Sequence, residues 1–162
     1  MNRTVGLLFA FCCAAMFQSC GEGAFYRADI DTPNGWEINK NLSFDLPQLN
    51  SNQSTFYIHL RNDNNYPFAN IFLVASLRQN DSLLVRDTLE YAMANPDGSW
   101  KGTGFLTVKA NKLWWREQQM PLIEGPLTIE LAQANRANGQ LKAAERLPGI
   151  VSVGISIETS EN

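Results

Sequence analysis

Strict alternation of apolar and polar side chains is the feature that most limits how this chain can fold. In residues 55–62 (TFYIHLRN) every second side chain is a large apolar one, and the same period of two recurs in residues 126–133 (PLTIELAQ) and 150–158 (IVSVGISIE). Successive side chains of a β-strand point to opposite faces. Each segment therefore predicts a strand with one buried face.

Further strand candidates fill most of the remaining chain. Residues 70–77 (NIFLVASL) are apolar on both faces, which predicts a central strand. Shorter candidates are Leu42–Leu46, Leu83–Tyr91, Phe105–Val108 and Leu113–Trp115.

Turn-forming residues separate these segments. Residues 61–67 (RNDNNYP) and 95–100 (NPDGSW) are rich in the Asn, Asp, Pro and Gly that favour tight turns. The polar stretch from Gln133 to Arg146 predicts a long loop with some helical turns, because Gly139 interrupts it. Seven or eight strands with few helices and no alternation of strands with helices predict an all-β fold, an antiparallel β-sandwich.

The N-terminus has the pattern of an export signal. Arg3 precedes the apolar segment Val5–Phe17, which is shorter than the roughly 20 apolar residues that span a bilayer. The segment leads into Gln18, Ser19 and Cys20. A small residue directly before a cysteine resembles a bacterial lipobox, in its looser Bacteroidetes form. An ordinary signal peptide that leaves Cys20 as a free thiol is the alternative.

With the lipobox, the sequence predicts that the chain divides into three parts. These are a signal peptide over 1–19, a lipidated N-terminus and tether over 20–35, and the sandwich over 36–162. Two or three acyl chains hold a protein firmly at a membrane, where one binds only marginally. A triacylated Cys20 thus predicts a durable anchor. Gly21 after the cysteine favours the outer membrane, and the periplasmic leaflet is favoured over the cell surface because Glu22 stands there without an acidic cluster.

Charge and cysteine content narrow the function classes further. The formal net charge is −3 and the Lys and Arg residues are scattered. Nucleic-acid binding proteins normally present a clustered basic face, so a nucleic-acid partner is not expected. Cys12 and Cys13 lie in the signal segment, so the mature chain keeps one cysteine and must be stable without an intramolecular disulfide.

Catalytic and metal-binding patterns are weak. The single histidine, His59, falls on the polar face of its strand, where we expect it to be exposed or half-buried. No second His or Cys of the sandwich could share a metal with it. The glycines at 149 and 154 flank Ser152 at the wrong spacing for a nucleophile elbow. We therefore expect no enzyme activity, cofactor or metal.

The adjacent tryptophans are the stronger lead to a binding site. Trp114 and Trp115 face opposite sides of a strand, so at least one can point outward beside Arg116. Trp and Arg are enriched at binding hot spots, and an exposed Trp also stacks on sugar rings. The three residues are candidates for partner or glycan binding. The alternative is that one Trp is core and a loop half-covers the other.

Three long blocks follow the lipobox in a fixed order, namely RNDNNYPFANIFLVASL (61–77), DTLEYAMANPDGSWKGTG (87–104) and RLPGIVSVGISIE (146–158). Together they resemble the GldH family of gliding-motility lipoproteins of the Bacteroidetes. The resemblance carries no catalytic residues. The matching positions are mostly turn formers and turn-packing aromatics, for which loop structure is the expected role, namely Asn62, Tyr66, Pro67, Asp97, Gly98, Trp100, Pro148 and Gly149.

The resemblance implies an outer-membrane lipoprotein of the gliding machinery and of the secretion apparatus associated with it. We expect a non-catalytic assembly or scaffold component, with the membrane as one partner through the acyl chains on Cys20 and envelope proteins as others. Two other functions stay open. One is a carbohydrate-binding module of a glycan-uptake lipoprotein, suggested by the Trp pair, and the other is a hydrolase.

Overall fold

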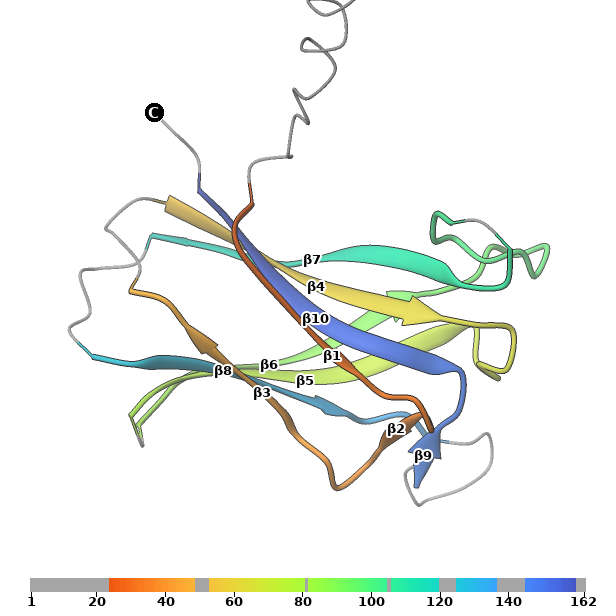
Figure 1. The fold of residues 1–162 in the computed structure, drawn as a ribbon, viewed down its shortest axis with the longest axis horizontal. Coiled ribbons are helices and arrows are strands. Elements are labelled where there is room, and N and C mark those ends of the chain that lie inside the picture. The colour runs from red at the N-terminus through yellow and green to blue at the C-terminus, as the bar shows by residue number, and fades with distance from the viewer. Residues whose placement is uncertain are drawn as a thin grey trace, which may run out of the picture.

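The structure is a computed structural model that describes residues 24–48, 53–80, 82–104, 106–119, 125–136 and 145–159. Across these ranges the chain forms strands and turns and no helix. Two four-stranded antiparallel sheets pack face to face, and a two-stranded sheet lies at one end (Figure 1). The predicted all-β sandwich is confirmed.

The first sheet, which we call the β10 sheet, has the strand order β1-β10-β4-β7. Its strands are β1 (Ala24–Asp31), β10 (Ile150–Thr159), β4 (Gln53–Asn62) and β7 (Lys109–Gln119).

The second sheet, the β5 sheet, has the order β3-β8-β5-β6. It contains β3 (Leu42–Leu46), β8 (Leu127–Gln133), β5 (Asn70–Gln79) and β6 (Ser82–Ala92). β2 (Trp36–Glu37) and β9 (Arg146–Leu147) form the small sheet.

The core lies between the two large sheets and consists of the apolar positions of the alternating segments. Phe56, Ile58 and Leu60 of β4 are buried, as are Ile129 and Leu131 of β8. β5 is a central strand between β8 and β6, as its apolar sequence predicted. Burial of each large aliphatic side chain stabilises the fold by about 1.5–3 kcal/mol, so the predicted period of two accounts for most of the packing.

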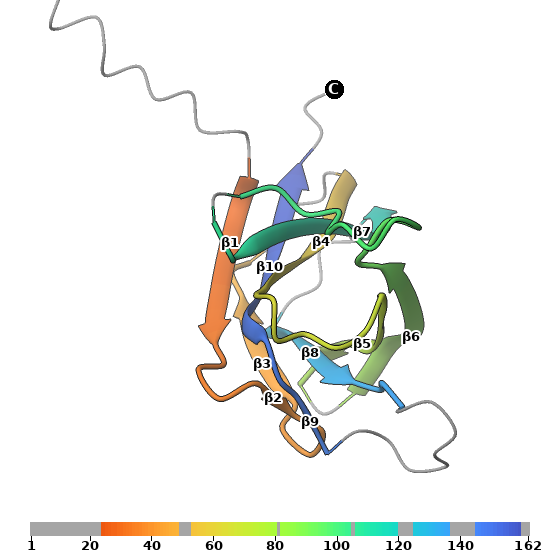
Figure 2. The same cartoon turned by 90° about the vertical axis from the view of Figure 1, so that its right-hand side faces the viewer.

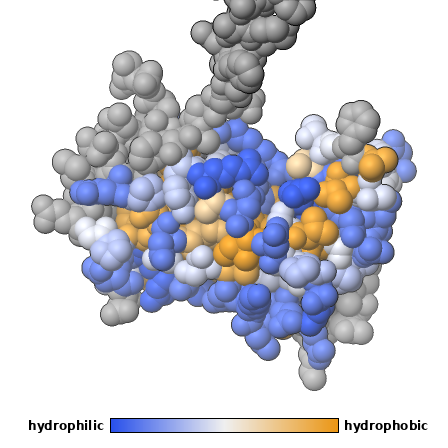
Figure 3. Space-filling view, in the orientation of Figure 1, coloured by the Kyte–Doolittle hydropathy of each residue, from blue (hydrophilic) through white to orange (hydrophobic). Residues whose placement is uncertain are grey.

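The two open sides of the sandwich are closed by hydrogen bonds between edge strands. On one side the Tyr26 hydroxyl of β1 donates to the carbonyl of Asp45 in β3 (2.8 Å). On the other side the Tyr91 hydroxyl of β6 donates to the carbonyl of Trp114 in β7 (2.6 Å). Figure 2 shows β1 and β3 along one side and β6 and β7 along the other. In Figure 3 apolar side chains form a band across the face where β1 and β3 lie.

The structure differs from the sequence predictions at the start of the domain. Ala24–Asp31 form the edge strand β1, where we predicted a tether that extends to residue 35. Tyr26, Ala28 and Ile30 pack against the core while the residues between them are exposed. Residue 24 therefore already belongs to the sandwich. The predicted signal peptide and Cys20 lie outside the described residues.

The predicted strand Phe105–Val108 is also wrong. Residues 106–107 form a turn, and Leu106 has a φ of 59° and is 89% exposed. Positive φ is incompatible with a regular strand. Like β1, the short strands β2 and β9 were not predicted, and the described residues form ten strands where we expected seven or eight. Within the predicted loop from Gln133 to Arg146, residues 137–144 lie outside the described part.

Candidate interaction surface

The two adjacent tryptophans of β7 point to opposite sides of the β10 sheet. Trp114 is 56% exposed on the outer face, directly across from Tyr57 of β4. Trp115 is 3% exposed in the core, where its ring packs edge-on against Phe56 (centroid distance 5.9 Å). The prediction that at least one ring points outward is correct for Trp114.

Arg116 does not join Trp114 on the surface. The pairing of β4 with β7 shifts register between Phe56 and Tyr57, which places Arg116 opposite the buried Phe56. Its Nη1 lies 3.1 Å from Oδ2 of Asp87 in β6, and the same oxygen accepts a hydrogen bond from Trp115 Nε1 (2.9 Å). Arg116 and Trp115 therefore close the side of the sandwich between β6 and β7, and the predicted binding trio is divided.

Trp114 instead shares its face with Tyr57 and Lys112. The Lys112 ammonium lies 4.3 Å from the centroid of the Tyr57 ring, a cation–π distance, and it forms an ion pair with Glu158 of β10. We call Trp114, Tyr57 and Lys112 the aromatic platform. An exposed indole beside a half-buried phenol can stack on a planar or apolar partner group.

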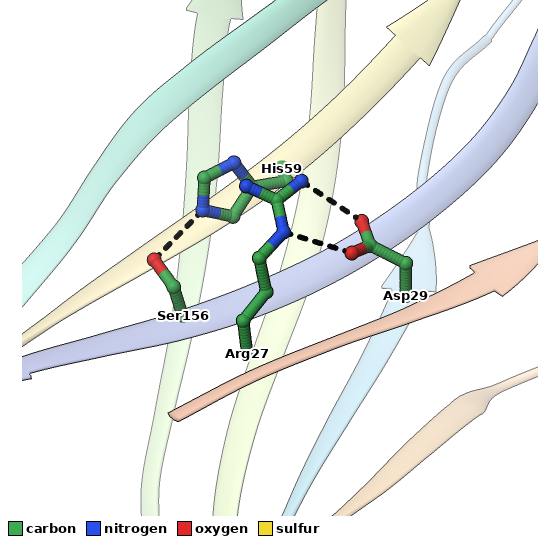
Figure 4. Close-up of polar contacts among 4 residues, drawn as sticks. All are labelled: Arg27, Asp29, His59 and Ser156. Carbon is green, nitrogen blue, oxygen red and sulfur yellow. Dashed lines mark hydrogen bonds and ion pairs between the residues drawn. The ribbon is translucent and has the colours of Figure 1, made fainter. Parts of the chain in front are cut away.

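His59 lies deeper in the same face, in a polar cluster with Ser156, Arg27 and Asp29 (Figure 4). Its Nε2 is 2.7 Å from Ser156 Oγ, and the residue is only 9% exposed, so the expectation of an exposed or half-buried side chain needs correction. Burial, reinforced by the Arg27 guanidinium, lowers the pKa of His59 to about 4. The imidazole is therefore neutral at physiological pH.

This cluster does not have the geometry of a serine hydrolase. The carboxylate of Asp29 is bound by Arg27 (Nε to Oδ2, 2.9 Å) and not by the histidine. Ser156 is 2% exposed. A nucleophile must reach its substrate and its base must be oriented by a third group. Within the described part of the chain, no three His, Cys, Asp or Glu side chains gather where they could hold a metal ion.

The residues that resemble the GldH blocks meet at one end of the sandwich. Three loops far apart in sequence, around residues 63–68, 95–100 and 148–149, lie at this end, at the right of Figure 1. The Tyr66 ring contacts the Trp100 ring (centroid distance 6.1 Å), and the Asp63 amide donates to the carbonyl of Gly149 (2.8 Å). We call this group of loops the loop cluster.

Individual residues of the loop cluster have clear structural roles. A Cβ at Gly149, where φ is 77°, would overlap the backbone nitrogen of Tyr66. Asp97 accepts a hydrogen bond from the Ser99 amide (2.9 Å), and Gly98 next to it has a φ of 85°. Asn62 is buried and accepts a hydrogen bond from Asn111 (3.0 Å). Pro67 is exposed in an irregular loop, and Pro148 is exposed in a turn.

Asn135 is a buried residue that the sequence did not single out. It is 1% exposed, and its Oδ1 accepts a hydrogen bond from the Phe72 amide (2.8 Å). Its Nδ2 donates to the Tyr66 hydroxyl and to the Asn70 carbonyl (both 3.3 Å). Asn135 thus joins the end of β8 to the loop cluster. Its place in a polar stretch gave no signal of this role.

No described helix is long and apolar enough to cross a membrane.

Comparison with known proteins finds matches along most of the chain. The sequence profile of the GldH lipoprotein family matches residues 25–157. The chain is 34% identical over 149 residues to the gliding motility lipoprotein GldH of Flavobacterium johnsoniae, covering 91% of this chain and 92% of that protein. It is 33% identical over 148 residues to a GldH homolog of Christiangramia forsetii, covering 91% of each. The latent dimeric PorU of Porphyromonas gingivalis has 12% identity and a TM-score of 0.34, over 86% of this chain and 14% of that one.

Proposed function

Because the chain belongs to the GldH lipoprotein family, we propose that it is an outer-membrane lipoprotein that serves as a non-catalytic assembly or scaffold component of the gliding motility and associated secretion machinery. The family description and the names of both relatives support a gliding motility lipoprotein and mention no catalytic activity. The observation that carries the proposal is the match along 91% of the chain.

The proposed mechanism is tethering. Acylation of Cys20 would confine the sandwich to a membrane surface and raise its effective concentration toward membrane-bound partners, without a need for high intrinsic affinity. β1 begins at Ala24, at the end of the sandwich opposite the loop cluster (Figure 1). The eight residues of β1 span about 26 Å. The loop cluster would therefore lie about one strand length from the start of β1.

The tethering mechanism is tested by Cys20→Ala in the full chain. We expect a folded protein that no longer fractionates with membranes and no longer supports gliding or secretion. Cys12→Ala is the matched control, because that cysteine lies in the predicted signal segment. Normal function from a soluble Cys20→Ala protein would refute tethering.

The membrane and leaflet are separate parts of the proposal. Density fractionation of membranes should place the protein with the outer membrane. Protease added to intact cells should leave it uncut if it faces the periplasm, and should degrade it if it is displayed on the cell surface. Cross-linking in intact cells followed by affinity purification would identify the partners.

Glycan binding is a second candidate, favoured by the exposure of Trp114 opposite Tyr57. If this function holds, oligosaccharides should quench the tryptophan fluorescence saturably, and Trp114→Ala should abolish the quenching. Trp115→Phe is the control, because Trp115 is buried and should not contact a sugar. Unsaturable or absent quenching across a broad oligosaccharide panel would reject this candidate.

A further inference from the structure

The outer face of the β5 sheet has an apolar strip at its centre. Phe72 and Val74 of β5 point away from the core and remain partly exposed, and Val74 pairs with Thr88 of β6 and Ala132 of β8. A cavity of about 320 Å³ lies beside Phe72, and one of about 250 Å³ extends over Val74 and Ser76. Short side chains between longer ones create this hollowed strip.

Four charged side chains surround the strip in an alternating pattern. Ser76 pairs with Arg86 on one side and Glu130 on the other. At the opposite end Glu90 pairs with Phe72, and Arg136 lines the cavity beside it. From the Ser76 end to the Phe72 end, the side-chain charge along β6 therefore changes from positive to negative. Along the β8 side it changes from negative to positive.

Three of these charges have no protein partner within the described part of the chain. Arg86, Glu130 and Arg136 make no ion pair or side-chain hydrogen bond there, and Glu90 accepts one hydrogen bond from Asn70 (2.7 Å). An apolar centre with a polar rim is the usual organisation of a protein–protein interface. The alternating signs make the face complementary to itself.

We propose that this face binds a second copy of the same chain, around a two-fold axis that crosses the strands at Val74. A two-fold contact brings the same patch of both copies together, so each contact occurs twice. The rotation reverses the order of residues along β5. Phe72 of each copy then lies over the cavity at Ser76 of the other, and Arg86 faces Glu90 of the second copy. By the same rotation Glu130 comes near Arg136 of the other copy.

A two-fold axis along β5 is the other way to bring the two faces together. It would place Phe72 on Phe72 and Arg78 on Arg78, because residues of the central strand would stay on the axis. Like charges directly opposite each other oppose association. An axis along β5 would also bring Arg86 toward Glu130 and Glu90 toward Arg136, so the four rim charges fit both arrangements. The central strand favours the axis across the strands, which places Arg78 over Asn70 of the second copy.

The available area and the position of the N-terminus agree with such a dimer. A four-stranded face with a ten-residue central strand covers about 600 Å² per copy, near the lower limit for a specific interface. β1 lies beside β3, on the side of the sandwich away from β6 (Figure 2). Rotation about the proposed axis leaves both β1 strands on one side of the dimer, as attachment to a single membrane requires. The dimer does not depend on the proposed scaffold role.

Cross-linking in cells tests the contact in the full chain. Thr88 lies on the proposed axis and is exposed, so Thr88→Cys should place two thiols face to face. A short bifunctional maleimide should convert this variant to a species of twice the monomer mass. Arg61→Cys is the matched control, because it is exposed on the β10 sheet and should give only the wild-type background.

Charge exchange then tests the axis. In the Thr88→Cys background, Arg86→Glu should reduce the dimer yield about tenfold. Glu90→Arg should do the same, and the combination Arg86→Glu with Glu90→Arg should restore the yield. Both residues are exposed, and circular dichroism melting should confirm that each variant folds.

Three results would overturn the dimer. They are equal cross-linking of Thr88→Cys and Arg61→Cys, no effect of Arg86→Glu in a folded protein, and a double exchange that fails to restore the yield. A cross-linked product whose mass is not twice that of the monomer would show that a different protein occupies this face.

Discussion

Asp87 should be one of the most important single carboxylates for the stability of the sandwich. Its Oδ2 accepts hydrogen bonds from Trp115 Nε1 (2.9 Å) and Arg116 Nη1 (3.1 Å), which join β6 to β7. Asp87→Ala would leave the nearly buried indole N–H without an acceptor, at a cost of about 1–3 kcal/mol. The partly exposed ion pair adds about 0.5–1 kcal/mol. We expect a loss of about 2–3 kcal/mol in the free energy of unfolding.

Urea denaturation of Asp87→Ala, Trp115→Phe and the double variant measures this contribution. Trp115→Phe removes the N–H, so Asp87→Ala should cost about 1–2 kcal/mol less in that background. Asp87→Asn keeps an acceptor oxygen for the indole and should lose about 1 kcal/mol or less. A loss below about 0.5 kcal/mol for Asp87→Ala, or additive effects in the double variant, would refute the argument that this contact closes the sandwich.

Three further predictions use other parts of the structure. Because the pKa of His59 is lowered to about 4 in the folded state, its contribution to stability should be complete above about pH 6.5 and fall as the pH drops toward 4. The free energy of unfolding should fall by about 1–2 kcal/mol over this range. This is less than the roughly 3 kcal/mol that the full pKa difference between the folded and unfolded states would give, because nearby charges and solvent screen the ring. His59→Gln should remove this pH dependence in urea denaturation. Gly149→Ala should cost at least about 2 kcal/mol and lower the melting temperature, since it combines a positive φ with overlap on Tyr66, whereas Gly98→Ala has open space and should cost less. Trp114→Ala should change stability by less than about 1 kcal/mol, because the ring is 56% exposed, and a larger loss of thermal stability would mean that the aromatic platform is structural.

The sequence predicted the strands whose apolar face is fully buried. In β4 and β8 every second side chain enters the core, so the period of two is unmistakable. β1 has the same alternation in Tyr26, Ala28 and Ile30, but an edge strand buries these side chains only partly. Arg and Asp residues between them made the segment look like a polar tether. Pairing of this short segment with β10 at the edge of a sheet is a tertiary property that composition does not reveal.

The orientation of the candidate binding residues was predicted in part. The adjacency of Trp114 and Trp115 required that they face opposite sides, and the structure has this arrangement. The register shift between β4 and β7 places Arg116 opposite Phe56 instead of on the outer face. Such a shift depends on strand pairing, which a single sequence does not specify. The predicted trio of Trp114, Trp115 and Arg116 thus became one exposed ring and two residues that close the sandwich.

The two outer faces of the sandwich differ in how their charges are satisfied, and this difference bears on where a partner binds. On the β10 sheet, Arg27 pairs with Asp29 and Lys112 with Glu158, and these long side chains surround the buried His59. A partner on that face would have to displace existing ion pairs, except at the exposed ring of Trp114. On the outer face of the β5 sheet, Arg86, Glu130 and Arg136 have no ion pair within the described residues, and the centre is apolar. Of the four rim charges there, only Glu90 makes a side-chain hydrogen bond, from Asn70, so binding would break few existing contacts and we expect a partner to bind the β5 face in preference to the β10 face.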